Sequence, residues 1–255
     1  MSTDDMKTTA DDEVSGSDLA EVMRARAANY RLLARLYRKE VDTALLRELL
    51  AMKFPLKTGT PEIDKGYRLL RSYLSHVWEG TLTELAVDYA RTFIGHGNTA
   101  YSAAYPFESV YTSPRRLLMQ EARDEVLALY RAAGWDKSDD WHDGEDHIAL
   151  ELEFAGALCD RAAQALVDGD EDSAYALTLQ QQSFLNDHLS NWIPLMLADL
   201  RRFAKTDFYQ GLGALTSGLL TSERKVLAEL LAGGASDDQA SAAEGCCAQG
   251  EGERA

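Results

Sequence analysis

Residues 144–158 read GEDHIALELEFAGAL, a stretch that joins a polar start to a strongly apolar continuation. After Glu145, Asp146 and His147, apolar residues return at every third or fourth position. This spacing places them on one face of an α-helix, which has about 3.6 residues per turn. The stretch therefore predicts a largely buried helix that begins with two acids and an imidazole.

The same spacing recurs along nearly the whole chain, and alternating runs of β-branched residues are missing. The pattern predicts an all-α protein, a single compact multi-helix domain of about nine helices. The helices are expected at about 17–37, 43–53, 61–80, 81–93, 114–133, 147–167, 171–189, 191–205 and 207–231.

Four of these boundaries depend on individual residues. Ser17 is expected to cap the first helix, and Thr60 with Pro61 fits the N-cap and first position of the third. A Ser-Pro pair at 113–114 is expected to begin a helix that Gly134 ends, because glycine readily adopts the left-handed conformation found after a helix.

The chain is strongly acidic, with a formal net charge of −16 at pH 7 and a pI near 4.7. Nucleic acids and anionic membrane surfaces need a basic footprint, so this charge argues against both. A cationic partner is favoured instead.

Part of the acidity lies at the two ends. Residues 1–16 and residues 233–255 each carry five acids against one basic residue, and both segments are poor in large apolar side chains. Such segments bury too little surface to offset the entropy lost on ordering. We therefore expect disordered acidic tails at 1–16 and 233–255 and a folded all-helical body at 17–232.

The chain has no feature of an exported or membrane protein. Its first residues lack the basic and apolar regions of a signal peptide, and no apolar run is long enough to span a membrane. Cys159 fits a small buried apolar residue, while Cys246 and Cys247 lack the spacing of a zinc site. These observations predict a soluble cytoplasmic protein without stable membrane insertion.

The polar residues of 144–158 leave several interpretations open. Glu145 could serve only to stabilise the start of the helix, because the positive end of a helix dipole favours acids. His147 and Glu151, four residues apart, could belong to a metal-dependent helical enzyme, although no second Glu-x-x-His pair occurs. Motifs for nucleophilic catalysis and phosphate binding are missing. A helical adaptor for an unrelated partner is a further alternative.

Three stretches together resemble one known family. They are FIGHGNTAYSAAYPFESVY at 93–111, GEDHIALELEFAGAL at 144–158 and FLNDHLSNWIPLMLADLRRFAKTDFYQGLGALTSGLL at 184–220. In this order and spacing they resemble the TorD/DmsD/NarJ-like family of redox enzyme maturation chaperones. The likeness covers roughly residues 20–225.

The resemblance implies an all-helical cytoplasmic chaperone rather than an enzyme. Such a protein binds the catalytic subunit of a molybdopterin-dependent oxidoreductase, its twin-arginine leader peptide, or both, and delays export until the cofactor is inserted. It implies no catalytic residue, no metal and no cofactor of the chaperone's own. Which oxidoreductase is served stays open, as does the choice between a monomer and a domain-swapped dimer.

The resemblance also assigns residues that bind the leader or the client. The family's aromatic-x-x-Leu-Phe motif falls on Tyr89 and Phe93, its Pro-aromatic loop on Pro106, Phe107 and Glu108, and its Asp-His pair on Asp146 and His147. This chain departs from the pattern twice. Thr92 stands where the family usually has leucine, and Glu145 stands where proline commonly precedes the Asp-His pair.

The chemistry of a twin-arginine leader fits these residue types. A leader presents two guanidinium groups ahead of a modest apolar segment, so its holder needs carboxylates beside an apolar surface. Glu145, Asp146 and Glu153 are expected to accept the guanidinium groups, because carboxylates bind arginine in bidentate fashion. Phe93, Pro106 and Phe107, with the small residues Ala149 and Gly156, are expected to supply the apolar surface, although Phe93 also fits a core position.

Overall fold

The computed structural model describes residues 15–55, 57–95 and 102–247, with side chains described as far as position 232. Of the predicted tails, residues 1–14 and 248–255 lie outside the described residues, whereas 233–247 are described as helical backbone; the division into tails and body stays a prediction. Within the described part no helix is long and apolar enough to cross a membrane.

The described residues confirm the all-α fold. Every regular element among them is helical, and the β-structure there is one isolated bridge between Phe107 and His147. The elements are α1 (Gly16–Arg38), α2 (Thr43–Ala51), α3 (Pro61–Leu74), α4 (Thr81–Tyr89), the π-helical η1 (Ala90–Ile94), α5 (Glu108–Thr112), α6 (Glu121–Ala132), α7 (Ile148–Val167), α8 (Glu171–Phe184), the π-helical η2 (Leu185–Leu189), α9 (Ser190–Phe203) and α10 (Asp207–Cys247).

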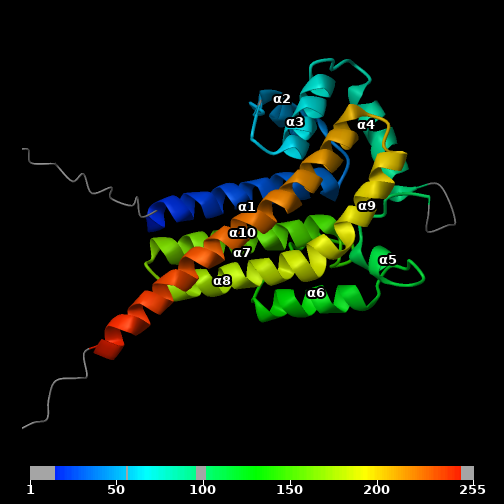
Figure 1. Ribbon diagram of the computed structural model, residues 1–255. Helices are drawn as coiled ribbons and strands as arrows, with labels where there is room; N and C mark the ends of the chain where they lie inside the picture. The colour runs from blue at the N-terminus through cyan, green and yellow to red at the C-terminus, as the bar shows by residue number, and fades with distance from the viewer. Residues whose placement is uncertain (1–14, 56, 96–101, 248–255) are drawn as a thin grey trace, which may run out of the picture.

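Helix α7 lies at the centre of the molecule. It packs along α1 on one side and α8 on the other, while α10 crosses this layer diagonally and packs against α3 (Figure 1). Helices α2 and α3 cover one end of the bundle, and α5 and α6 flank the other end of α7 in Figure 1. The helix predicted from residues 144–158 is thus the one around which the others are arranged.

Burial on α7 follows from its sequence. Ile148, Leu152, Phe154 and Cys159 are all buried, which confirms the prediction for Cys159. Gly156 faces α1, where an added Cβ would lie 3.4 Å from the Ala27 carbonyl oxygen, an ordinary contact distance. Ala149 and Gly156 are both buried, so these small residues lie in the core.

The expected helix boundaries are confirmed in two cases and wrong in two. Thr60 and Pro61 stand at the N-cap and first position of α3, and Gly134 follows α6 with a φ of +59°. The cap of α1 is Ser15 rather than Ser17, because the Ser15 side chain accepts from the Asp18 amide while the Asp18 carboxylate accepts from the Ser15 amide.

Residues 113–120 are not the first turns of a helix, as the Ser-Pro pair had suggested. Arg116 and Met119 have φ values of +53° and +58°, which an α-helix does not accept, and α6 begins only at Glu121. Tertiary bonds hold this conformation, since the Gln120 amide donates to Ser109 Oγ and Arg116 donates to Asp199 on α9. Local helix preference is overridden by contacts with α5 and α9.

Two helices are longer or more continuous than expected. Helices α8 and α9 form one continuous rod through η2, and Pro194, which removes a backbone donor, lies inside α9 shortly after that π-helical turn. Helix α10 continues to Cys247 instead of ending near 231. Extending an existing helix needs no new nucleation, and the alanines after that point favour helix, whereas Gly233, Gly234 and Gly245 disfavour it.

A buried ion pair joins the first and last helices. Arg26 of α1 donates from Nε and Nη2 to Glu223 Oε2 of α10 at 3.0 and 2.7 Å. Tyr30 adds a hydrogen bond to the same oxygen at 2.9 Å. Both charged side chains are almost fully buried, so each charge needs the other to offset the free-energy cost of its removal from water.

We expect Glu223→Ala to lower the free energy of unfolding by about 3–5 kcal/mol, because it leaves the Arg26 charge buried without its partner. The double variant Arg26→Met with Glu223→Leu should recover most of the loss. Urea unfolding followed by circular dichroism would measure both. Glu48→Ala, which removes an exposed ion pair with Arg35, is the control and should change little. Equal losses in the single and double variants would contradict this account.

Candidate functional site

Two of the predicted motifs meet at the start of α7. The Glu108 amide donates to the Asp146 carbonyl and the Ile148 amide donates to the Pro106 carbonyl, both at 2.9 Å. These bonds and the bridge between Phe107 and His147 pair the two segments in antiparallel fashion. We call this region, residues 106–109 with 144–148, the junction.

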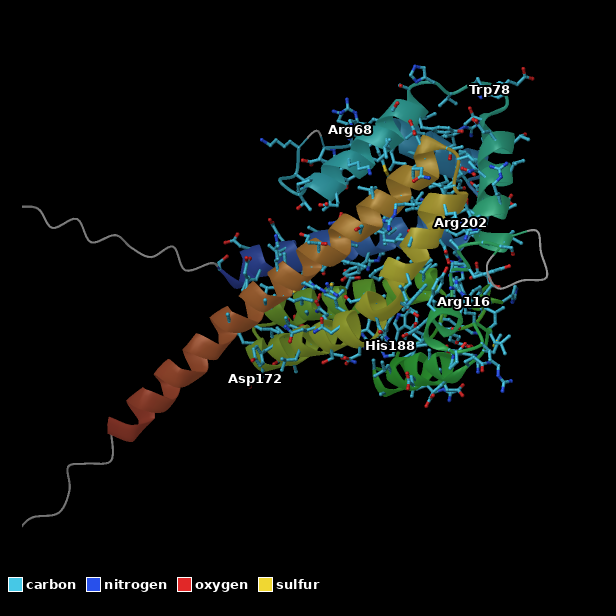
Figure 2. The ribbon with its side chains drawn as sticks, turned by 45° about the vertical axis from the view of Figure 1, so that its right-hand side comes forward. Arg68, Trp78, Arg116, Asp172, His188 and Arg202 are labelled. Atoms are coloured by element: carbon cyan, nitrogen blue, oxygen red, sulfur yellow. The ribbon has the colours of Figure 1, made fainter. Side chains whose placement is uncertain are left out.

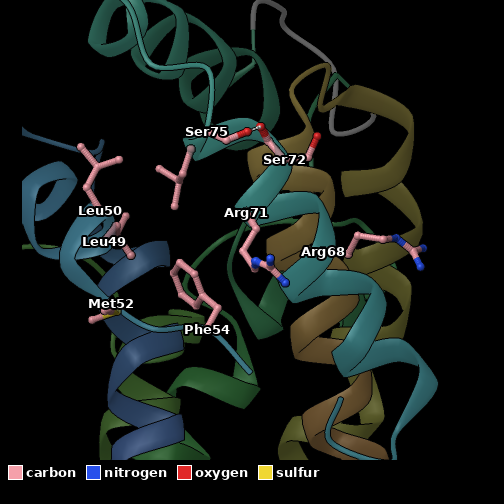
Figure 3. A pocket seen from close by; sticks show the side chains of 9 residues that line it. Leu49, Leu50, Met52, Phe54, Arg68, Arg71, Ser72 and Ser75 are labelled. Carbon is pink, nitrogen blue, oxygen red and sulfur yellow. Dashed lines mark hydrogen bonds between the residues drawn. The ribbon is translucent and has the colours of Figure 1, made fainter. Parts of the chain in front are cut away.

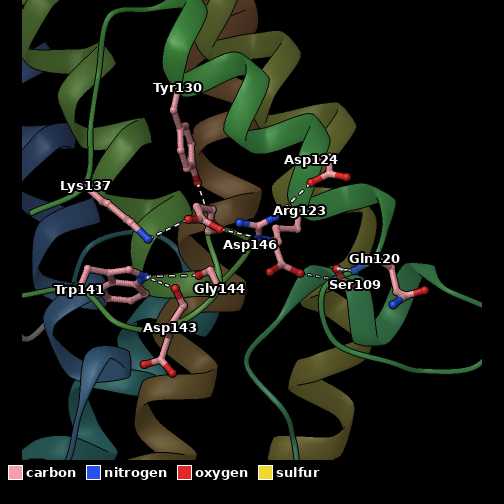
Figure 4. A network of polar contacts seen from close by, with 11 residues as sticks. Ser109, Gln120, Arg123, Asp124, Tyr130, Lys137, Trp141, Asp143, Gly144 and Asp146 are labelled. Carbon is pink, nitrogen blue, oxygen red and sulfur yellow. Dashed lines mark hydrogen bonds and ion pairs between the residues drawn. The ribbon is translucent and has the colours of Figure 1, made fainter.

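Asp146 fixes the start of α5 from across the junction. Its Oδ2 accepts from the Ser109 amide at 2.9 Å, so it supplies the cap that α5 lacks from its own N-cap residue, Phe107 (Figure 4). The side chain is buried, and its Oδ1 has no hydrogen-bond partner among the described residues. Asp146 therefore positions the loop and keeps one buried oxygen available.

Glu145 holds two cations of the chain itself. Arg123 Nε donates to Oε2 at 2.6 Å and Lys137 Nζ donates to Oε1 at 2.7 Å. Burial alone would raise the pKa of Glu145, but the hydrogen bonds from Lys137 and Arg123 outweigh it and lower that pKa. The glutamate that replaces the family's usual proline is thus ionised and already paired.

His147 is a structural residue at the N-cap of α7. Its Nδ1 accepts from the Ala149 amide at 3.0 Å, and its ring lies edge-on between Phe107 and Trp141. Burial, with a smaller contribution from the charge of Arg38, lowers the pKa of His147 to about 3. The imidazole is therefore neutral at physiological pH and holds the Phe107 ring in place.

Tyr89 and Phe93 lie in an aromatic core cluster beside the junction. Their ring centroids are 5.0 Å apart, and Phe93 also contacts Tyr37 and Tyr209. Both residues are buried. The Thr92 carbonyl accepts from the Ala104 amide at 2.7 Å, which ties this helix to the loop that leads to the junction.

Glu153 lies one turn further along α7 and faces α1. It is half-buried, with Oε1 3.7 Å from Arg38 Nη1, and burial raises its pKa. Arg38 also pairs with Asp140 and lies over the Trp141 ring. Glu153 therefore belongs to a separate polar group on the Trp141 side of His147, where its partner among the described residues is Arg38.

An apolar surface next to the junction was missed by the sequence analysis. Leu117, Leu118 and Met119 are 46%, 48% and 61% exposed, and Leu195 on α9 is 53% exposed. Arg116, which precedes Leu117 in the chain, donates to Asp199, four residues beyond Leu195, and so fixes its segment to this part of α9. We call these four apolar residues the apolar patch.

The sequence carried no sign of this exposure. With a helix expected from Pro114, the leucines at 117 and 118 fit a core stripe, and only the left-handed conformations of Arg116 and Met119 turn them outward. Behind the patch, side chains of α5 and α9 contact each other. Tyr111 of α5 stacks on Trp192 of α9 at 5.8 Å and donates to Asp199.

Two open cavities lie elsewhere on the surface and contain none of the predicted site residues. One, of about 480 Å³, is lined by Leu50, Met52, Phe54 and Arg71 between α2 and α3 (Figure 3). The other, of about 510 Å³, lies beside Trp78 and Arg91. In the described part of the chain no three His, Cys, Asp or Glu side chains are arranged to hold a metal ion.

The comparisons with known proteins agree with the motifs. Residues 60–198 match the family described as "Nitrate reductase delta subunit". The chain is also similar to proteins named "Chaperone protein TorD". It is 32% identical to that of Photobacterium profundum over 58% of this chain and 66% of the relative. It is 30% identical to that of Aliivibrio fischeri over 85% and 99%, and 26% identical to that of Shewanella pealeana over 81% and 91%.

These matches confirm the resemblance inferred from the three motif stretches. The family match covers more than half of the chain and includes both strands of the junction. The chain therefore belongs to the nitrate reductase delta subunit family, which includes the TorD-like proteins.

Proposed function

We propose that this protein is a maturation chaperone for a molybdopterin-dependent oxidoreductase. It binds the catalytic subunit, its twin-arginine leader, or both, aids cofactor insertion and delays export, and it performs no covalent chemistry itself. The observation that carries the proposal is that the family match at 60–198 spans the junction and the apolar patch. Relatives aligned over nearly their full length are named as chaperones.

The apolar patch supports a role in binding the leader's apolar segment. Four large apolar side chains are left exposed beside α5, and each could bury surface against a bound peptide. The left-handed residues that expose them are unfavourable by about 1–3 kcal/mol each, a cost found mostly at functional sites. Phe107, which is half-buried in the junction, extends this surface toward the predicted motif.

The charged residues around the patch support a role in binding guanidinium groups. Arg116 occupies Asp199, and Arg123 occupies Glu145, so both carboxylates already stand in geometries that accept an arginine. A leader arginine would take the place of one of these internal partners. Asp146, with its unpartnered Oδ1, is a third acceptor if the loop at 106–112 moves.

The predicted residues then divide into two groups. Glu145, Asp146 and Glu153 supply charge, and Pro106 and Phe107 supply the adjoining apolar contact; Glu145, Asp146 and Pro106 are buried, so they would reach a ligand only after residues 106–112 move. Tyr89, Phe93, Glu108 and His147 are buried as well, and their rings or polar atoms are engaged within the core or the junction, so we propose that they act by positioning residues 106–112.

We expect Leu118→Ser to weaken binding of a synthetic twin-arginine leader peptide about ten-fold or more, because burying one leucine side chain contributes about 1.5–3 kcal/mol. The thermal unfolding midpoint should stay unchanged, since the side chain is half exposed. Isothermal titration calorimetry would measure the affinity. Leu179→Ser on α8, at a position 42% exposed, is the matched control and should bind as the wild type does. Equal affinity in both variants would remove the patch from the binding surface.

We expect affinity for the same peptide to fall as salt rises from about 0.05 to 0.5 M, because exposed charge pairs are screened over about 10 Å at 0.1 M. Asp146→Asn should weaken binding about ten-fold at low salt and flatten the salt dependence. Its amide oxygen can still accept from the Ser109 amide, so the fold should be kept. Asp172→Asn, at the far end of the molecule in Figure 2, is the control. Salt-independent binding would contradict a role for these charges.

A further inference from the structure

Two glutamates from different segments are buried together behind the junction. Glu108, in the first turn of α5, is 2% exposed, and Glu151, in the first turn of α7, is fully buried. His188 and Trp192, four residues apart on one helical rod, each contact one of these carboxyl groups, which brings the two carboxyl groups to the same buried place. Two adjacent ionised carboxylates in such a place would repel each other strongly, so their arrangement needs a physical explanation.

Each glutamate has one donor from the rod formed by α8, η2 and α9. His188 Nδ1 lies 3.0 Å from Glu108 Oε2, and Trp192 Nε1 donates to Glu151 Oε2 at 3.0 Å. The other oxygen of Glu151, Oε1, receives no donor from the described residues. A buried acceptor without a donor is rare, and a proton held between the two carboxyl groups would satisfy it.

The surroundings offer little positive charge. The titratable groups that face Glu151 are Glu108 on α5, Asp146 before α7 and Tyr130 on α6, while His188 reaches Glu108 from η2. Trp192 contributes from α9 a donor that does not titrate. Burial, and next the charge of Glu108, raise the pKa of Glu151 well above its usual value. The neutral form of Glu151 is therefore the one that fits this interior.

We infer that Glu151 is protonated at neutral pH and donates its proton in a hydrogen bond to Glu108, and that this bond fixes α5 to α7. Glu108 in turn accepts from His188, so one chain of hydrogen bonds joins α7, α5 and η2. Glu108 and Glu151 are then positioning residues for the junction. Their effect on leader binding rests on the proposed function, whereas the shared proton does not.

The sign of the pH dependence follows. Because folding raises the pKa of Glu151, the protonated bond is intact at low and neutral pH and is lost as pH rises through that raised value. On the alkaline side the two carboxylates repel, and α5 with residues 106–109 should loosen. Acidification should leave this contact intact.

Hydrogen–deuterium exchange of the peptide covering 104–112, corrected for the intrinsic effect of pH, tests the inference in the full-length chain. In the wild type, protection of the Glu108 and Ser109 amides should fall as pH rises from about 6 to about 9, by up to ten-fold per unit, as for a buried glutamate of raised pKa. Glu151→Gln should keep its protection throughout, because its amide group donates to Glu108 at every pH. In Glu151→Ala the Glu108 and Ser109 amides should be weakly protected at every pH.

Glu125→Gln, at an exposed position on α6, is the matched control and should follow the wild type. The inference is overturned if protection in Glu151→Gln falls with pH as it does in the wild type. It is also overturned if, at neutral pH, the amides of Glu151→Gln are as weakly protected as those of Glu151→Ala. Calorimetry with the leader peptide separates the two proposals. Affinity should decline with alkaline pH in the wild type and stay level in Glu151→Gln. Protection as expected, with no leader binding by any variant at any pH, would refute the proposed function and uphold the shared proton.

Discussion

The burial of α7 on nearly every side is the constraint on which the fold depends. A helix that is apolar around most of its circumference has to be covered by other elements. Helices α1 and α8 pack along α7, and Tyr130 of α6 contacts its Phe154. Its first turn is buried as well, and that turn carries polar groups. Partners for these groups have to come from other segments, because a buried polar group without a hydrogen bond is unfavourable. The junction and α9 meet this need, since the Ser109 amide of α5 donates to Asp146 and Trp192 of α9 donates to Glu151.

The interior acids are satisfied in three different ways. Glu145 is ionised and paired with two cations, Asp146 accepts from a backbone amide, and Glu223 accepts from an arginine and a tyrosine. Each solution ties together segments that are distant in sequence. In an acidic chain, these buried carboxylates therefore act as connectors between helices, and substituting one of them affects at least two elements.

The sequence predicted the regular part of the structure and missed the part that depends on distant contacts. The spacing of apolar residues was sufficient to predict α7. Helix-capping preferences correctly placed Pro61 at the start of α3 and Gly134 after the end of α6. The same rules placed Leu117 and Leu118 in a helix, because the bonds of Arg116 to Asp199 and of Gln120 to Ser109 have no local sign. The motif residues of the site were named from the resemblance. Their burial could not be predicted from local sequence. Nor could the pairing of Glu145 with Arg123 and Lys137, because it depends on how α6 and the segment after it pack near the start of α7.

Glu145 and Asp199 are each paired with an arginine of the same molecule, and this has a consequence for selectivity. A carboxylate that faces water would attract any lysine-rich or arginine-rich segment, and a protein of net charge −16 would collect such segments nonspecifically. Here each carboxylate is already satisfied by a side chain of the same molecule, so exchanging one cation for another gains little free energy. A net gain requires a ligand that also buries apolar surface. Built-in counterions of this kind make discrimination depend on the combination of charge and apolar surface, and they keep weakly matched cationic segments from accumulating.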